Sequence, residues 1–330
     1  MIIACPTIGA CVFGGKELKN VNQLTKGAMF LAIFSVLLFI TLYIPLLGGI
    51  INFFLPLPFI LFAAQNNLKS SALLLVGAIF LSLILGTMLA IPMTIVCGMT
   101  GISIGYLIHK NKSRWIVFFA SSMVFLSNLI VFYIVSVVFF QVNIIKEFNQ
   151  MMKESTNISI DMMEKIGQAP NEQVIQQFQN NLSMLETLMP SVFVLGAFMS
   201  VLIIMIVSIP IIKRFGVQLS QWTPLRELTL PKSLLWYYLI CMALSMFIHP
   251  EQGTYLYIAV SNLLFILQMC MILQGVSFIF YYCHVKGFGK AVPVTVIVFS
   301  MLLPFLLYIV RIFGIIDLGF DLRRRLEKKQ

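Results

Sequence analysis

The side chains that could bind a ligand lie deep inside long apolar runs, where a polar group is costly. Asn128 is the most polar residue deep in the first five runs. Because an amide in hydrocarbon must find a partner, we expect Asn128 either to hydrogen-bond to another helix or to contact a ligand. Asn262, Gln268 and Gln274 lie in a later run, and at about 100° per residue they point in three directions. This spacing favours three separate interhelical contacts over a conduction path.

Sequence motifs for enzymatic chemistry are absent. The chain holds no P-loop, GxGxxG, HExxH or GxSxG motif in a context that would support it. Its three histidines fall at the ends of apolar runs, and no run carries the central pair of carboxylates that a proton-driven pump usually needs. None of the six cysteines forms a CxxC pair, so neither a zinc site nor a disulfide framework is expected. We therefore expect a protein that is not an enzyme and has no metal or cofactor.

The composition indicates that lipid surrounds most of the chain. Of its 330 residues, 60% are hydrophobic and 10% are charged, whereas soluble domains hold about 45–50% apolar and about 25% charged residues. The net charge of +10 comes from Lys and Arg residues that lie between apolar runs. The positive-inside rule explains this distribution, so the expected partner is the lipid bilayer and not nucleic acid. We expect an all-α polytopic protein of the plasma membrane with about eight to nine transmembrane helices.

The charges also give an expected orientation. Lys16, Lys19 and Lys26 precede the first apolar run, which places the N-terminus in the cytoplasm. No cleavable signal pattern is present. The expected segments, in chain order, are a lead-in (1–20), five spans (21–142), an external amphipathic helical insertion (143–189), four further spans (190–316) and a basic tail (317–330).

Residues 71–109 are the clearest membrane element. They contain no Asp, Glu, Lys or Arg, and they are about twice as long as the ~20 residues that cross a bilayer. Because the residue before a proline avoids helical geometry, we expect two spans that fold back at Ile91–Pro92. Small residues recur at every fourth position on both sides of the bend, which favours close helix packing in lipid. These residues are Ser82, Gly86, Ala90, Cys97, Gly101 and Gly105.

Two other segments depart from simple spans. The second span follows an expected turn at Gly48–Gly49, and it carries Pro56 and Pro58, which bend or break a helix. The insertion at 143–189 has three Lys against six Asp or Glu, which fits the outer face. Its apolar residues predict two amphipathic helices. These helices either lie on the membrane surface or form a lid over an external cavity.

Two arguments disagree about which side of the membrane holds the C-terminal tail. Nine full crossings from an inside N-terminus would put the strongly basic tail outside, although the positive-inside rule places it inside. Either the tail violates the rule, or one run does not fully cross: the short second or seventh run, or the last run, which Pro304 splits. Asp321 and Arg325 are four residues apart and are expected to pair on a helix.

Motifs at both ends of the chain resemble a known family. They read TKGA at 25–28, LYIPLLG at 42–48, LPLPF at 55–59, RIFGIID at 311–317 and DLRRR at 321–325. They resemble the YybS-like family of bacterial membrane proteins, which carry a domain of unknown function, over about residues 21–325. The resemblance implies a polytopic membrane protein and no established activity.

The front of the chain, about residues 21–212, is also similar to the substrate-binding S components of energy-coupling-factor transporters. Six spans, a proline-rich second span and a small-residue first helix carry this likeness. It implies that Ala28 and Ala32 dock a transmembrane coupling subunit, which works with partner ATPases. It also implies a small solute bound from outside near Asn128 and the 143–189 insertion. The alternative is a non-transport scaffold or regulator that acts through partner proteins.

Overall fold

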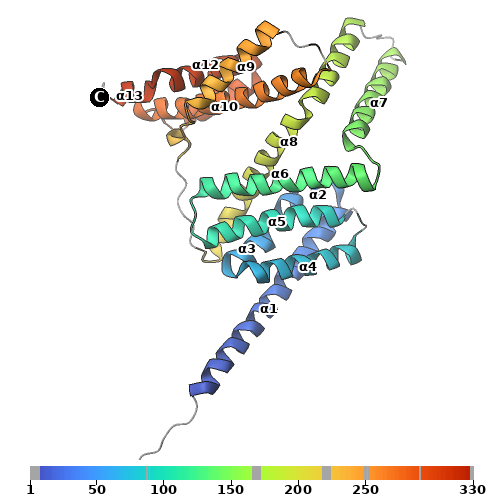
Figure 1. Cartoon of the computed structure of the whole chain (residues 1–330), viewed down its shortest axis with the longest axis vertical. Coiled ribbons are helices and arrows are strands. Elements are labelled where there is room, and N and C mark those ends of the chain that lie inside the picture. The colour runs from blue at the N-terminus through green and yellow to red at the C-terminus, as the bar shows by residue number, and fades with distance from the viewer. Residues whose placement is uncertain are drawn as a thin grey trace, which may run out of the picture. The chain divides into compact units, whose positions relative to one another are not determined.

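The computed structural model describes residues 8–86, 88, 90–165, 172–217, 224–248, 251, 253–289 and 291–327. Within these residues the regular structure is helical throughout (Figure 1). The helices are α1 (Ile8–Tyr43), α2 (Pro45–Ile51), η1 (Asn52–Phe54), α3 (Leu57–Gln65), α4 (Leu68–Leu85), α5 (Ala90–His109), α6 (Arg114–Phe139), α7 (Ile144–Lys165), α8 (Glu172–Arg214), η2 (Leu225–Glu227), α9 (Ser233–Ile248), α10 (Tyr255–Val285), α11 (Ala291–Leu302), α12 (Pro304–Phe320) and α13 (Leu322–Glu327).

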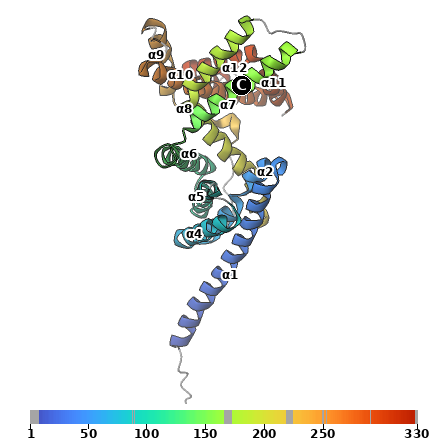
Figure 2. The same cartoon turned by 90° about the vertical axis from the view of Figure 1, so that its right-hand side faces the viewer.

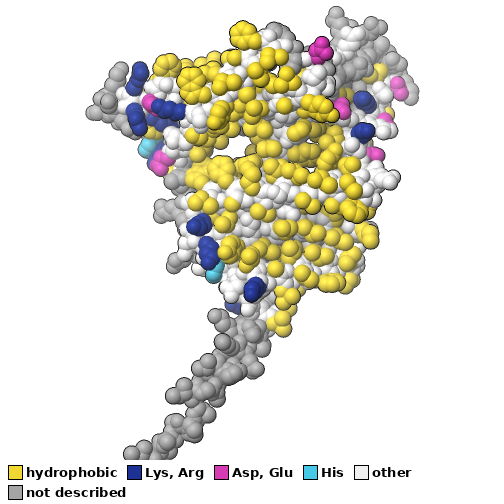
Figure 3. Space-filling view, viewed as in Figure 1, with side chains coloured by type: hydrophobic (Ala, Val, Ile, Leu, Met, Phe, Trp, Pro, Cys, Tyr) yellow, Lys and Arg dark blue, Asp and Glu magenta, His cyan; other side chains and the backbone are white. Residues whose placement is uncertain are grey.

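Seven helical stretches of the described chain are long and apolar enough to cross a bilayer, and α9 and α11 are shorter apolar helices. Large apolar side chains cover much of the outer surface, as Figure 3 shows over α4, α5 and α6. A water-soluble protein rarely exposes apolar patches of this extent. The expectation of an all-α polytopic membrane protein is therefore confirmed.

The chain forms two compact units. Unit 1 comprises Met1–Val142 and Gly196–Trp222, and unit 2 comprises Asn143–Leu195 and Thr223–Gln330. Helix α1 begins at Ile8, inside the expected lead-in. The 43-residue helix α8 contributes to both units, and it runs without interruption through the boundary expected between residues 189 and 190.

The broken second span forms the centre of unit 1. Every residue of α3 from Pro58 to Ala64 is buried, as expected for a helix that is apolar on all sides. The Phe59 ring packs edge-on against Phe34 of α1, with 5.1 Å between the ring centroids. The turn before this span lies at Ile44, which is extended because Pro45 follows it, and the expected turn at Gly48–Gly49 is helical.

Helices α4, α5 and α6 form one layer of unit 1, seen end-on in Figure 2. The bend between α4 and α5 lies between Leu85 and Ala90, slightly before the expected Ile91–Pro92. Pro92 instead sits in the first turn of α5. A proline costs little there, because the first amides of a helix have no partner within it.

Glycines bring α5 into backbone contact with α3. A Cβ atom at Gly101 would lie 2.6 Å from the Pro56 carbonyl oxygen, and one at Gly105 would lie 2.4 Å from that of Ile60. Larger residues would push the two helices apart. Ser82 and Ala90, from the same small-residue set, are also fully buried.

In unit 2, α10 and α12 pack side by side (Figure 1). A Cβ atom at Gly275 would lie 1.9 Å from the Val310 carbonyl oxygen, and one at Gly314 would lie 2.0 Å from that of Met271. As the residue number rises along α12, from Val310 to Gly314, the number of the contacted residue on α10 falls, from Gly275 to Met271. The two helices are therefore antiparallel. Two glycines therefore allow the close approach of α10 and α12.

The side chain of Asn262 on α10 hydrogen-bonds to α8 beside Pro190, which has no backbone N–H to donate within α8. Asn262 Oδ1 accepts hydrogen bonds from the Ser191 amide (2.9 Å) and from Ser191 Oγ (2.6 Å). Asn262 Nδ2 donates to the carbonyl oxygen of Thr187 (2.7 Å). The amide side chain thus bridges an acceptor and a donor one helical turn apart. The interhelical role expected for Asn262 is confirmed.

We predict that Gly275→Ala and Gly314→Ala destabilise the protein, because an added methyl group must separate α10 from α12. Overpacking of this kind costs about 1–3 kcal/mol. The measurement is the melting temperature in detergent, followed by the loss of monodisperse protein on size exclusion. Gly196→Ala on α8 is the matched control, since open space surrounds its Cβ position. An equal response of all three variants would contradict the glycine contact.

Candidate functional site

Unit 1 contains a cavity of about 260 Å³ among the broken second span, α5, α6 and α8. The break in the second span exposes η1 to this space, and the N-terminal turn of α5 forms another wall. Its lining residues are Asn52, Phe53, Pro92, Met93, Val96, Cys97, Phe125, Leu129, Phe132, Ser200 and Ile204. Small-molecule sites are mostly apolar and carry a few placed polar groups, and this cavity has that composition.

The polar group of interest in the cavity is the amide of Asn52. Its Oδ1 atom is buried and has no hydrogen-bond partner within the described part of the chain. Ser200 and the buried Cys97 add a hydroxyl and a thiol to the lining. None of the described lining residues is Asp, Glu, Lys or Arg. The cavity therefore offers hydrogen bonds to a ligand but no charge.

Asn128 is a sequence neighbour of residues that line this cavity, but it does not line the cavity itself. It sits on α6 between Phe125 and Leu129, which both line the cavity. The Asn128 side chain is half-buried, and its Nδ2 donates to the Val124 carbonyl oxygen of the same helix (2.7 Å). Sequence reasoning did not select Asn52. The signal that could have found it was its position between two proline-induced breaks, at Pro45 and Pro56.

Ala28 and Ala32 lie on the exposed side of α1. Ala28 also borders a groove of about 380 Å³ that α1, α3 and α4 enclose. The groove is mainly apolar, with Gln23 and Ser70 among its lining residues. This side of α1 is therefore open to another helix or to lipid.

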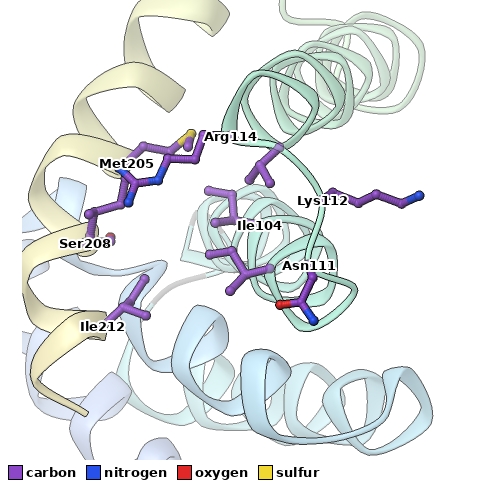
Figure 4. A pocket seen from close by; sticks show the side chains of 10 residues that line it. Ile104, Asn111, Lys112, Arg114, Met205, Ser208 and Ile212 are labelled. Carbon is purple, nitrogen blue, oxygen red and sulfur yellow. The ribbon is translucent and has the colours of Figure 1, made fainter. Parts of the chain in front are cut away.

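A second, smaller pocket of unit 1 lies beside Arg114 (Figure 4). The buried Arg114 side chain extends from α6 toward Met205 and Ser208 on α8. Ser208 Oγ is buried without a hydrogen-bond partner among the described residues. The pocket holds about 10 Å³, which is roughly the space for one water molecule. It is therefore too small for an organic ligand.

Unit 2 holds a buried polar cluster around Asp317 of α12. Asp317 Oδ2 accepts hydrogen bonds from Gln274 Nε2 (2.6 Å) and Arg323 Nε (3.0 Å). The side chains of Asp317 and Arg323 are only 3% and 12% exposed. Gln274 Oε1 in turn accepts from the Leu230 amide (2.9 Å). The interhelical contact expected for Gln274 is confirmed.

The cluster continues from Arg323 into the loop before α9. Arg323 Nη1 donates to the Arg226 carbonyl oxygen (2.7 Å), and Nη2 donates to Ser277 Oγ (2.9 Å). Ser277 Oγ lies 2.7 Å from the carbonyl oxygens of both Leu225 and Leu228. These bonds join Arg323 of α13 to the loop and to α10, and they provide hydrogen-bond donors for three carbonyl groups of the loop.

The ion pair expected between Asp321 and Arg325 does not form on a helix. Asp321 is left-handed (φ 49°) and lies between α12 and α13. The Arg325 amide donates to the Asp321 carbonyl oxygen (3.3 Å), but no ion pair joins their side chains among the described residues. The Asp321 carboxylate instead accepts a hydrogen bond from Lys232 and forms an ion pair with it. This bond, together with the positive charges of Lys232, Arg324 and Arg325, lowers the pKa of Asp321. The contact is thus present at neutral pH, and on acidification it is lost as the pH falls through that lowered pKa.

No group of three His, Cys, Asp or Glu side chains suited to a metal ion occurs among the described residues. Besides the Arg114 pocket and the groove beside α1, the described residues offer hydrogen bonding in the unit 1 cavity and ion pairing in the unit 2 cluster.

We predict that Asp317→Ala strongly destabilises the protein, because it leaves the Arg323 guanidinium buried without its carboxylate. Breaking a buried pair in this way costs about 3–5 kcal/mol. Asp321→Ala is the matched control, since Lys232 and Asp321 are 60% and 40% exposed and solvent screens their attraction. Both are measured by thermal unfolding in detergent. Equal melting temperatures for the two variants would show that the buried cluster does not stabilise unit 2.

The comparisons agree with the family resemblance seen in the sequence. The family described as "Predicted membrane protein (DUF2232)" matches residues 32–318. The chain is 28% identical to "Uncharacterized protein YybS" of Bacillus subtilis (strain 168) over 313 residues, which cover 94% of this chain and 100% of that relative. No solved structure gives a significant match. The chain belongs to the DUF2232 family of membrane proteins and resembles YybS over nearly its full length.

Proposed function

We propose that the protein binds a small, uncharged and mainly apolar solute in the unit 1 cavity, as the binding subunit of an importer in the plasma membrane. The single observation that carries this proposal is the cavity itself, with its apolar lining and one buried amide oxygen that lacks a partner. In this proposal the N-terminus lies in the cytoplasm and the solute enters from the outer side. The protein acts by binding and not by catalysis.

The lining supports an uncharged solute. An ion in an apolar cavity is costly unless an opposite charge compensates it, and the described lining residues carry none. Phe53, Phe125 and Phe132 provide flat apolar surfaces that suit a ring system. The cavity of about 260 Å³ is near the lower end of the ~300–1,000 Å³ typical of ligand pockets. A molecule of one or two rings has a suitable size.

Asn52 supports a hydrogen-bond donor on the solute. A buried acceptor without a partner costs about 1–3 kcal/mol. A hydroxyl or N–H group on the ligand would remove that cost by donating to Asn52 Oδ1. The bound state would then be more stable than the empty cavity.

Import would require partners, since the sequence holds no nucleotide-binding motif. The exposed small side of α1 at Ala28 and Ala32 supports docking of a transmembrane coupling subunit. Small residues let two helices approach closely in lipid. The ATPases of such a complex would supply the energy.

A scaffold or regulatory function is the alternative, and helix α7 favours it. Phe148, Met151, Ile158 and Met162 are all exposed on this amphipathic helix. An apolar stripe of this kind suits a partner protein or the membrane surface. In that case the purified protein would carry envelope or signalling proteins and no stoichiometric small molecule.

We predict that protein purified in mild detergent retains a small molecule and that Asn52→Leu lowers its occupancy roughly tenfold, as the loss of one buried hydrogen bond implies. Liquid chromatography with mass spectrometry measures the ligand released per protein. Asn128→Ala is the control, because its side chain is bonded within α6. The opposite ranking of the two variants would assign the ligand contact to Asn128, and empty wild-type protein would favour the scaffold.

We also predict that Ala28→Leu and Ala32→Leu abolish co-purification of a coupling subunit and its ATPases, because longer side chains block close helix approach. The partners are quantified by mass spectrometry after affinity capture. Ala259→Leu, at an exposed position of α10, is the matched control and should leave capture unchanged. Undiminished capture by the α1 variants would remove α1 as the docking surface.

A further inference from the structure

We propose that α11 and α12 enter and leave the bilayer on one side, so that the C-terminal segment 321–327 lies on the same side as the 224–232 loop. The last apolar run then makes no net crossing. The inference is independent of the proposed function, because it rests only on contacts within unit 2.

The lengths of the two helices support this arrangement. Helix α11 has 12 residues and α12 has 17, which correspond to about 18 Å and about 25 Å at 1.5 Å per residue. A spanning helix needs about 20 residues. Leu303, extended because Pro304 follows it, separates the two helices. Helix α11 alone is therefore too short for an upright crossing. Helix α12 is about as long as α9, so its contacts and not its length decide its course.

The path of α12 along α10 shows where the run turns back. Phe313 packs against Phe278, Gly314 lies against Met271, and Asp317 bonds to Gln274. Because the helices are antiparallel, α12 starts near the C-terminal end of α10 and stops beside its middle. The left-handed Asp321 then reverses the chain.

The reversed segment returns to the part of α10 that contacts the 224–232 loop. Arg323 donates to Ser277 Oγ and lies over the Tyr281 ring, 5.2 Å from its centroid. It also donates to the Arg226 carbonyl oxygen, and Asp321 pairs with Lys232. Polar contacts this short require the loop and the chain end to share one side of the membrane.

The charge distribution agrees with this topology. Basic side chains gather near the C-terminal end of unit 2 (Figure 3), and Arg226, Lys232, Arg323, Arg324 and Arg325 all belong to the loop or to the chain end. One-sided entry leaves eight crossings: α1, the broken second span, α4, α5, α6, α8, α9 and α10. An even number places both termini on one side, which removes the conflict with the positive-inside rule.

The test is cysteine accessibility in the full chain, with all six native cysteines replaced. Glu227→Cys reports the loop, Arg325→Cys the chain end, and Glu251→Cys the opposite end of α10; all three positions are exposed. A membrane-impermeant maleimide is applied to intact cells and to inverted vesicles. We expect Glu227→Cys and Arg325→Cys to react together in inverted vesicles, each at least tenfold more than in cells, and Glu251→Cys to react in cells. Arg325→Cys reacting together with Glu251→Cys would overturn the proposal.

A second measurement does not depend on sealed vesicles. In a Lys232→Cys/Asp321→Cys variant with a protease site at Gly253, a short bismaleimide should keep the two cleavage fragments joined. The control pair Glu251→Cys/Asp321→Cys should separate after cleavage. Separation of the first pair, with both cysteines shown to be alkylated, would also overturn the proposal.

Discussion

A backbone amide or carbonyl without a partner is too costly to leave in hydrocarbon, and both units depend on meeting this constraint wherever a helix is interrupted. In unit 2, Asn262 bridges the turn of α8 at Pro190. In unit 1, His109 Nδ1 donates to the Ala64 carbonyl oxygen near the end of α3, 3.0 Å away. Side chains from neighbouring helices thus make interrupted helices compatible with the membrane.

Close packing supplies what the hydrophobic effect cannot supply between helices in lipid. Gly101 and Gly105 let α5 approach α3, and Gly275 and Gly314 do the same for α10 and α12. In each unit the approach also sets a polar feature: the walls of the cavity in one, and the buried Asp317 cluster in the other. A small change in helix spacing would therefore alter chemistry as well as stability.

The two polar features differ in a way that separates their roles. Around Asp317, donors and acceptors from α10, α12, α13 and the loop before α9 match one another. A matched buried network favours one rigid arrangement. In the unit 1 cavity, Asn52 Oδ1 lacks a partner beside apolar walls. A network whose hydrogen bonds are all made gains no further hydrogen bond from a ligand. An acceptor without a partner, facing a cavity, gains one when a ligand donates to it. This contrast is the reason why we propose ligand binding in unit 1, whereas the matched Asp317 cluster joins the elements of unit 2.

The sequence by itself determined the membrane class, the helical content and most spans, because hydrophobic length is a local property. It also identified the family and the interhelical role of Asn262. Only the tertiary structure decided which distant groups meet: Asn52 with the α5, α6 and α8 walls, and Arg323 with Asp317 and the loop at Arg226. The farthest of these partners, Asn52 and Ile204, are about 150 residues apart in the sequence. The Asp321 carboxylate likewise pairs with the distant Lys232 and not with its neighbour Arg325. Local patterns predict helices, but the match of donors and acceptors between helices depends on how the chain folds.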